Sequence, residues 1–163
     1  MVFKTKEIQK TNEQNISDVL KEARNKNTQI KEMIGKVESD SLKQNIKEIN
    51  ESVNKIIDTL EKNHKKYKKM NNFFDYYLPV TLSILMKYDE IENQRLTSEE
   101  GKKFMKQTES MIEKINNAFK SQLSNLYQSD IVDTDAVMKV FETMLKADGY
   151  DTSDDFKKNE KEE

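Results

Sequence analysis

The sequence predicts an all-α protein, an elongated antiparallel bundle of three long helices followed by a short C-terminal helix. Apolar residues recur at steps of three and four along most of the chain, which is the spacing of one helix face. Hydrophobic residues make up only 34% of the 163 residues and charged residues 36%. Such a lean apolar share suits long helices better than a sheet buried on both faces. Glycine (3) and proline (1) are too scarce to supply the turns of a β-protein.

The first helix is expected over residues 12–36. Thr11 and Gln14 have the spacing of a capping box at its start. Its apolar row alternates steps of four and three through Ile16, Leu20, Ala23, Asn27, Ile30, Ile34 and Val37. The next apolar residue, Leu42, follows after a step of five, so we expect a break near Gly35–Asp40. A stutter within one continuous helix is the alternative.

The second helix is expected over residues 40–95 and passes through the single proline. Its apolar row keeps one phase across Pro79 and contains Leu42, Ile46, Ile49, Val53, Ile56, Leu60, Phe74, Leu78, Leu82, Leu85 and Tyr88. We therefore expect one helix kinked at Pro79, where a hydrogen bond is lost and the ring presses on the carbonyl of Asp75. The alternative breaks the chain at Asn71–Asn72 and places Pro79 in the first turn of a new helix, where its missing N–H costs nothing.

Two further helices are expected over residues 98–128 and 134–147. Thr97 and Glu100 form a capping-box pattern before the first of them. Its apolar row is Phe104, Met111, Ile112, Ile115, Phe119, Leu123 and Leu126. The last helix has Asp133 as its expected N-cap, and its apolar residues are Val137, Val140, Phe141, Met144 and Leu145.

The helical bundle domain is expected to span residues 12–149. Gly149 suits the position just after the end of the last helix. Residues 1–11 lack a clear period and are expected to form a flexible N-terminus. Residues 150–163 read as a disordered polar tail of mixed charge.

Charge and composition exclude several classes of protein. A net charge of −2 argues against a general nucleic-acid binder. The chain has no cysteine, which excludes disulfides and cysteine metal sites. Residues 1–10 lack the apolar stretch of a secretory signal, and residues 76–86 fall far short of the roughly 20 apolar residues that span a membrane. We therefore expect a cytoplasmic protein.

No catalytic residue, metal site or cofactor is predicted. His64 is the only histidine, and with Glu61 it forms one Glu-x-x-His pattern. Di-metal bundles use that pattern twice, and the second histidine is missing here. The acidic segment from Asp148 departs from the EF-hand loop, because Tyr150 and Ser153 occupy its third and sixth positions.

The lysines and aromatic residues around residues 62–77 allow two interpretations. The lysines are Lys62, Lys65, Lys66, Lys68 and Lys69, and such runs are usually solvated helix faces. Together with the neighbouring aromatic residues they could instead contact an anionic membrane at its inner face. We expect Phe74, Tyr77 and Leu78 to pack in the core beside the bend.

The same stretch resembles the signature of the 5-bromo-4-chloroindolyl phosphate hydrolysis family, the XpaC-like proteins of Firmicutes. The matching residues are Phe73, Phe74, Tyr76, Tyr77, Leu78, Pro79, Thr81, Leu82, Lys87 and Tyr88. Later matches are Ala118, Phe119, Gln122, Leu123, Leu126, Tyr127, Asp130, Asp133, Asp135, Leu145, Lys146, Asp148 and Gly149. The resemblance covers about residues 30–150. It marks Phe74, Tyr76, Tyr77, Leu78, Pro79, Thr81 and Tyr88 as signature or interaction residues.

The resemblance and the residues lead to three functional hypotheses. The family name implies a phosphate-ester hydrolase, and the family is associated with toxic-anion resistance. The residues themselves lack a catalytic set and offer long apolar faces, so we expect a non-enzymatic interaction or adaptor protein that binds a protein partner or a second copy of itself. Hydrolysis of the indolyl phosphate and peripheral membrane binding are the alternatives.

Overall fold

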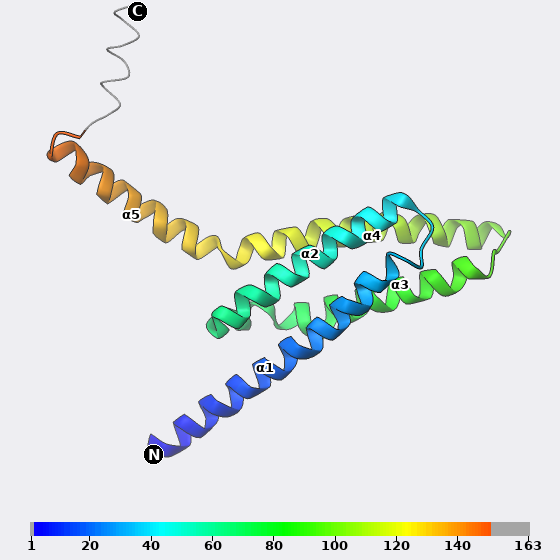
Figure 1. The fold of residues 1–163 in the computed structure, drawn as a ribbon, viewed down its shortest axis with the longest axis horizontal. Helices are drawn as coiled ribbons and strands as arrows, with labels where there is room; N and C mark the ends of the chain where they lie inside the picture. The colour runs from blue at the N-terminus through cyan, green and yellow to red at the C-terminus, as the bar shows by residue number, and fades with distance from the viewer. Residues whose placement is uncertain (1, 151–163) are drawn as a thin grey trace, which may run out of the picture. The chain divides into compact units, whose positions relative to one another are not determined.

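The computed structural model describes residues 2–150, with side chains from residue 12 onward, and all regular structure in that range is helical. The elements are α1 (Val2–Met33), α2 (Asp40–Lys62), a 3-10 helix η1 (His64–Met70), a π-helix η2 (Phe73–Tyr77), α3 (Leu78–Asn93), α4 (Glu99–Leu126) and α5 (Gln128–Ala147) (Figure 1). The predicted all-α class is confirmed. The chain divides into two compact units, Met1–Leu126 and Tyr127–Glu163, which are described separately.

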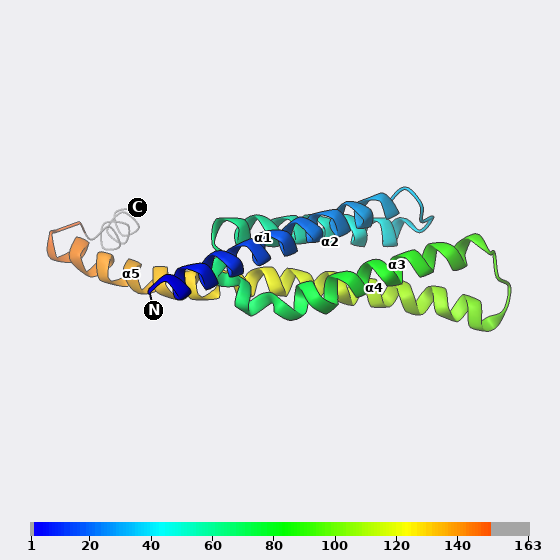
Figure 2. The same cartoon turned by 90° about the horizontal axis from the view of Figure 1, so that it is seen from below.

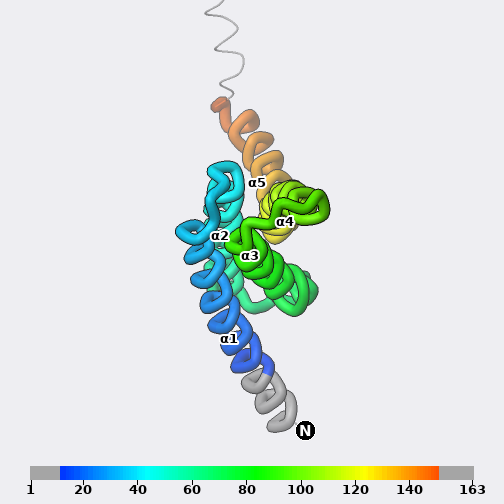
Figure 3. Tube along the Cα trace, turned by 90° about the vertical axis from the view of Figure 1, so that its right-hand side faces the viewer, coloured from blue at the N-terminus to red at the C-terminus, as the bar shows by residue number. Residues whose placement is uncertain are grey.

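The first unit is an antiparallel four-helix bundle in two layers. The hairpin of α1 and α2 packs on the hairpin of α3 and α4 (Figure 2). Helix α1 contacts α2 and α3, and α4 contacts the same two helices. Both hairpin turns lie at one end of the bundle, the end that faces the viewer in Figure 3. The prediction of three long helices and a short one is therefore wrong.

The prediction fails at the expected helix 40–95, because the chain reverses direction inside it. Helix α2 ends at Lys62, and Asn63 leaves the helical conformation (φ −145°, ψ 89°). The Asn63 side chain accepts a hydrogen bond from the backbone N–H of Lys65 at 3.2 Å, which replaces continued helix by a local turn. Pro79 lies in the first turn of α3, which agrees with the alternative prediction, and does not kink a long helix. The break nevertheless comes at Asn63 and not at Asn71–Asn72.

A π turn leads into Pro79. The backbone N–H of Leu78 bonds to the carbonyl of Phe73, five residues back, where an α-helix would span four. In a regular α-helix the ring of Pro79 would press on the carbonyl of the residue four positions before it. Here that residue belongs to the wider π turn. The hydroxyl of Thr81 then donates to the carbonyl of Tyr77 at 2.6 Å. The local sequence thus forms a helix start that tolerates proline.

The break expected between the first two helices is confirmed. Helix α1 ends at Met33, and the backbone N–H of Val37 returns to the Met33 carbonyl at 3.1 Å. Ser39 is the N-cap of α2, and its hydroxyl accepts from the N–H of Leu42 at 3.2 Å. Helix α1 begins at Val2, so the expected start at residue 12 is wrong. The helix-forming Lys, Glu and Gln of this stretch sustain helix without an apolar row.

Helix α4 starts at Glu99, next to the expected residue 98, whereas α5 starts at Gln128, well before the expected residue 134. The hydroxyl of Ser98 accepts from the N–H of Gly101 at 3.1 Å, beside the expected cap Thr97. Helix α5 begins at Gln128, so Asp133 lies inside the helix and is not its N-cap. Gly149 (φ 87°) closes α5 as expected, because the left-handed conformation suits glycine. The flexibility of residues 1–11 stays a prediction, and the tail from residue 151 lies outside the described residues.

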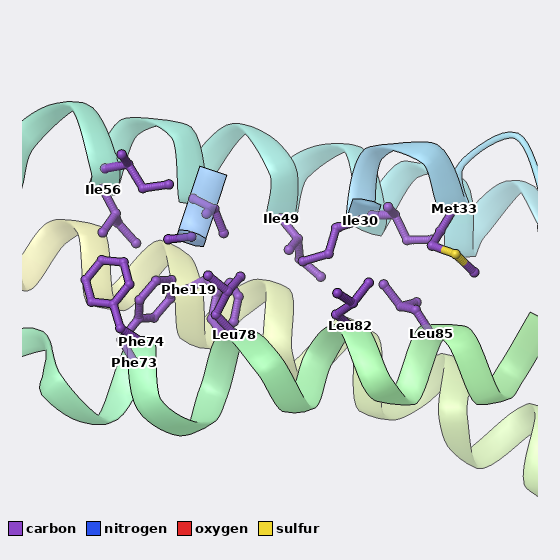
Figure 4. Packing of buried hydrophobic residues seen from close by; sticks show 14 of the residues in the cluster. Ile30, Met33, Ile49, Ile56, Phe73, Phe74, Leu78, Leu82, Leu85 and Phe119 are labelled. Carbon is purple, nitrogen blue, oxygen red and sulfur yellow. The ribbon is translucent and has the colours of Figure 1, made fainter. Parts of the chain in front are cut away.

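The core of the bundle combines the apolar rows of all four helices (Figure 4). The rings of Phe73 and Phe119 meet edge to face with centroids 4.9 Å apart, and Phe73 meets Phe74 at 5.0 Å. Fully burying one such side chain contributes about 1.5–3 kcal/mol. The buried members include Leu20, Ile30, Met33, Leu42, Ile46, Ile49, Val53, Ile56, Leu60, Leu78, Leu82, Leu85 and Ile112.

Buried amides fix the register of α1 against α2. The side-chain amide of Asn27 donates to the backbone carbonyl of Asn50 at 3.0 Å, and the side-chain amide of Asn50 donates to the backbone carbonyl of Asn27 at 2.9 Å. The Asn27 amide also donates to Oδ1 of Asn54 at 2.9 Å. Asn27 interrupts the apolar row of α1 because it serves this contact, and sliding either helix would leave its buried amide without a partner.

Candidate interaction surfaces

The π turn sends two aromatic pairs to opposite sides of the chain. Phe73 and Phe74 are 1% and 6% exposed, whereas Tyr76 and Tyr77 are 61% and 45% exposed. The two tyrosine rings meet edge to face with centroids 5.9 Å apart. The expectation that Tyr77 packs in the core is therefore wrong, whereas it is confirmed for Phe74. Tyr77 is exposed because the π turn changes the angle between successive side chains, whereas the prediction assumed the spacing of a regular α-helix.

Tyr76 and Tyr77 border an open groove of about 490 Å³ between α3 and α4. We call it the α3–α4 groove. Two small side chains, Thr81 and Ala118, are among its lining residues. Lys114 is the one charged side chain among its lining residues. These are Tyr76, Tyr77, Val80, Thr81, Ile84, Met111, Lys114, Ile115, Ala118, Phe119 and Gln122.

The other signature residues hold α3 in place. Leu78 and Thr81 are each 1% exposed, and Pro79 is half-buried. Tyr88 is buried, and its hydroxyl donates to Oε1 of Glu109 on α4 at 3.1 Å. Burial, followed by the negative charge of Glu109, raises the pKa of Tyr88 well above its usual value. Of the seven residues marked by the resemblance, Tyr76 and Tyr77 are thus exposed, and the other five are buried or half-buried.

A polar cluster ties the two hairpin turns together. The two terminal guanidinium nitrogens of Arg95, Nη1 and Nη2, both donate to the carboxylate of Glu38, across the end of the bundle. This contact lowers the pKa of Glu38. Glu92 lies buried beside them, and burial, followed by repulsion from Glu38, raises the pKa of Glu92. Arg95 adopts a left-handed conformation (φ 54°), which places its side chain toward the other hairpin.

The predicted lysine run is divided between α2 and η1. Lys66 donates from Nζ to the carbonyl of Leu126 at 2.9 Å and so caps the end of α4. Lys62, Lys65, Lys68 and Lys69 have exposed side chains. The five lysines therefore do not form one face of a regular helix, and contact with an anionic surface stays a prediction. Among the described helices, none has both the length and the hydrophobicity needed to cross a bilayer.

The Glu-x-x-His pattern is split by the chain reversal. The carboxylate of Glu61 accepts from Nε and Nη2 of Arg24 at 3.2 Å and 3.0 Å. His64 follows the break at Asn63 and is the first residue of η1, so the two side chains do not share an α-helical face. Among the described side chains, those of residues 12–150, no group of three or more His, Asp or Glu could hold a metal ion.

Helix α5 forms a second surface, which the sequence analysis had assigned to the bundle. Its apolar side chains Val137, Val140, Phe141 and Met144 are 66%, 64%, 59% and 58% exposed. We call these four residues the α5 face. These four members of the predicted row are thus exposed, whereas its fifth member, Leu145, is half-buried. On the far side of the helix, Lys139 pairs with Asp135 at 3.0 Å and Lys146 pairs with Glu142 at 3.6 Å.

The comparisons with known proteins agree with the signature. No curated protein and no solved structure matches the chain. A family model described as 5-bromo-4-chloroindolyl phosphate hydrolysis protein matches residues 3–141, which include the π turn, the groove and most of α5. The predicted resemblance is thereby confirmed, and the chain belongs to the 5-bromo-4-chloroindolyl phosphate hydrolysis protein family.

Proposed function

We propose that this chain is a non-enzymatic interaction protein that binds an amphipathic helix of a protein partner in the α3–α4 groove. The observation that carries the proposal is the exposed pair Tyr76 and Tyr77 at the edge of an apolar groove of about 490 Å³. Tyrosine, methionine and other large side chains are enriched where proteins meet. A helix binds such a groove through apolar side chains at positions i, i+3, i+4 and i+7.

Contacts with the core tie the lining of the groove in place, which favours binding. Phe119 packs on Phe73 beneath the floor, and the Thr81 hydroxyl is bonded to the backbone of Tyr77. A preformed site avoids part of the ordering cost of association. On the surface Met111 supplies an adaptable side chain, and Lys114 supplies one cation. We therefore expect the partner helix to present an apolar row with an acidic residue beside it.

A photo-crosslinking residue placed at Tyr77 tests the proposal in the source cells. The matched control carries the same residue at Lys47, which is exposed on α2 and does not line the groove. We expect Tyr77, but not Lys47, to capture a defined protein, and Ala118→Glu to abolish the capture. The purified captured protein should then bind the wild-type chain and lose at least about tenfold in affinity for the Ala118→Glu variant. Equal capture at both positions would count against the proposal.

Hydrolysis of an aryl phosphate is the second candidate function. The family description names 5-bromo-4-chloroindolyl phosphate, and an aromatic groove with a single lysine suits an indole ring and a phosphate group. The lining residues include neither a histidine nor a carboxylate. Hydrolysis would also need a nucleophile or a metal-activated water. For this reason the interaction function comes first.

Turnover by the purified chain separates the two functions. We expect no release of the indolyl product above the buffer blank, with or without added Mg²⁺, Mn²⁺ or Zn²⁺. Metal-dependent turnover that is lost in a His64→Ala or Glu61→Ala variant would replace the interaction proposal by the hydrolase.

Peripheral membrane binding through Lys62, Lys65, Lys68 and Lys69 is a further proposal with its own test. Salt-sensitive sedimentation with anionic vesicles, but not with neutral vesicles, would support it.

A further inference from the structure

Helix α5 has the properties of a groove-binding helix. The four residues of the α5 face follow the spacing i, i+3, i+4, i+7 and are all more than half exposed. Contiguous exposed apolar patches often mark a contact with another protein. The flanking positions Ala136 and Ala147 are small, so the face can approach another helix closely.

The charges of α5 oppose those along α4. Helix α5 contains four acidic and two basic residues, a net charge of −2. Hollows follow the outer side of α4 on from the α3–α4 groove, and they are lined by Lys102, Lys103, Lys106 and Lys114. Two glutamates, Glu99 and Glu100, stand only at the start of this row. An acidic amphipathic helix therefore fits this surface better than a neutral or basic one.

The connection between α4 and α5 decides from which copy the helix comes. A single residue, Tyr127, separates the end of α4 at Leu126 from the start of α5 at Gln128. Its backbone is itself in the helical region (φ −100°, ψ 0°). Antiparallel helix neighbours in one chain are joined by about two to eight residues. A link of one residue is shorter than these connections, which favours a second molecule as the source of the helix.

We propose that α5 of a second copy of this chain binds in the α3–α4 groove through Val137, Val140, Phe141 and Met144, so that two copies exchange their α5 helices. This inference rests on the proposed function, because it names an occupant for the same groove. An exchange of this kind is two-fold symmetric, and each copy supplies one helix and one groove. The dimer therefore contains two identical contacts.

Two variants with matched controls test the exchange by analytical ultracentrifugation of the full chain. Phe141→Asp disables the helix, and Ala118→Glu places a carboxylate in the groove. Each is expected to weaken the dimer at least about 30-fold, since buried aromatic anchors dominate such contacts. The controls Lys139→Asp, on the far side of α5, and Asn117→Glu, exposed beside Ala118, should dimerise like the wild type. All four positions are exposed, so folding should be retained, and circular dichroism checks this.

Mixing the two disabled variants distinguishes a contact between helix and groove from a dimer formed by two like surfaces. The Phe141→Asp copy keeps its groove and the Ala118→Glu copy keeps its helix, so the mixture should form a heterodimer with one contact although each variant alone is monomeric. A dimer of Ala118→Glu alone would point to pairing between α5 helices and overturn the proposal. A dimer of Phe141→Asp alone would do the same in favour of contact between grooves.

The failure of this inference can be told from failure of the proposed function. A wild-type chain that stays monomeric at every concentration overturns the exchange of α5. If Tyr77 then still captures another protein, the groove keeps its proposed function. If it captures none, both proposals fail.

Discussion

Helices α2 and α5 have the same kind of apolar row, but only the row of α2 is buried. In α2 the row is fully enclosed, with Ile46, Ile49, Val53 and Ile56 all at 0% exposure. In α5 the four residues of the α5 face are each more than half exposed. Spacing by threes and fours thus determines which face of a helix is apolar, but not what covers it. The difference lies in the neighbours, since α2 contacts both α1 and α4.

The largest difference in stability between the bundle and α5 is expected for substitution of a core phenylalanine. Phe119 is buried against Phe73, and Phe119→Ala should lower the free energy of unfolding by about 3–5 kcal/mol through lost contacts and a cavity. Urea denaturation followed by circular dichroism measures this loss. A loss below about 1 kcal/mol would mean that the bundle repacks around the gap.

The buried amides come next. Asn27→Ala removes two hydrogen bonds and leaves the Asn50 carbonyl and the Asn54 side chain short of a donor, so unfolding should become easier by about 1–3 kcal/mol. The control Asn25→Ala, at an exposed position of the same helix, should change stability by less than about 0.5 kcal/mol. Equal effects at both positions would show that the amide pair does not tie α1 to α2.

A smaller effect, which depends on pH, is expected at Glu92. Its pKa is raised in the folded state, so its ionised form destabilises the fold at neutral pH, and this penalty disappears as pH falls through the folded-state pKa. Glu92→Gln should therefore be more stable than wild type at neutral pH, and the difference should shrink as the solution is acidified. Denaturant midpoints at a series of pH values measure it, with the exposed Glu51→Gln as control. A constant difference across pH would contradict the assignment.

The smallest change is expected for the same substitution in α5. Phe141→Ala, measured at a concentration where the chain is monomeric, should change the free energy of unfolding by less than about 0.5 kcal/mol, because the ring is 59% exposed. Thermal and urea unfolding of the variant and of Phe119→Ala can be compared directly. A loss as large as that of Phe119→Ala would show that the α5 face is covered within the monomer.

The sequence predicts the helix faces well, because burial on one side leaves a period that can be counted. Ile30, Ile49 and Phe119 of the predicted rows all lie in the core, although Met111 of the α4 row is exposed. The reversal after Lys62 could not be predicted from that period. Helices α2 and α3 both turn their apolar sides into one core, so the phase continues although the direction changes. Asn63 was the available signal, since asparagine favours turns over helix interiors.

The groove was only partly predictable. The resemblance drew attention to Tyr76 and Tyr77, yet their exposure depends on the π turn, which follows from no pattern of apolar residues. Lys114, Ala118 and Met111 come from a helix more than thirty positions further on, and nothing in the sequence alone pairs them with α3. Whether the apolar face of α5 is covered likewise depends on its neighbours, which the spacing of apolar residues does not show.

The π turn also makes the length of this segment critical. The hydrogen bond that closes the π turn spans one residue more than that of an α-helical turn. Each residue rotates an α-helix by about 100°. Deleting Asp75 would restore the spacing of a regular α-helix. Either the phenylalanines Phe73 and Phe74 or the start of α3 would then rotate out of the interior. A homologue with an insertion or deletion between Phe73 and Pro79 should therefore have lost the tyrosine edge of the groove.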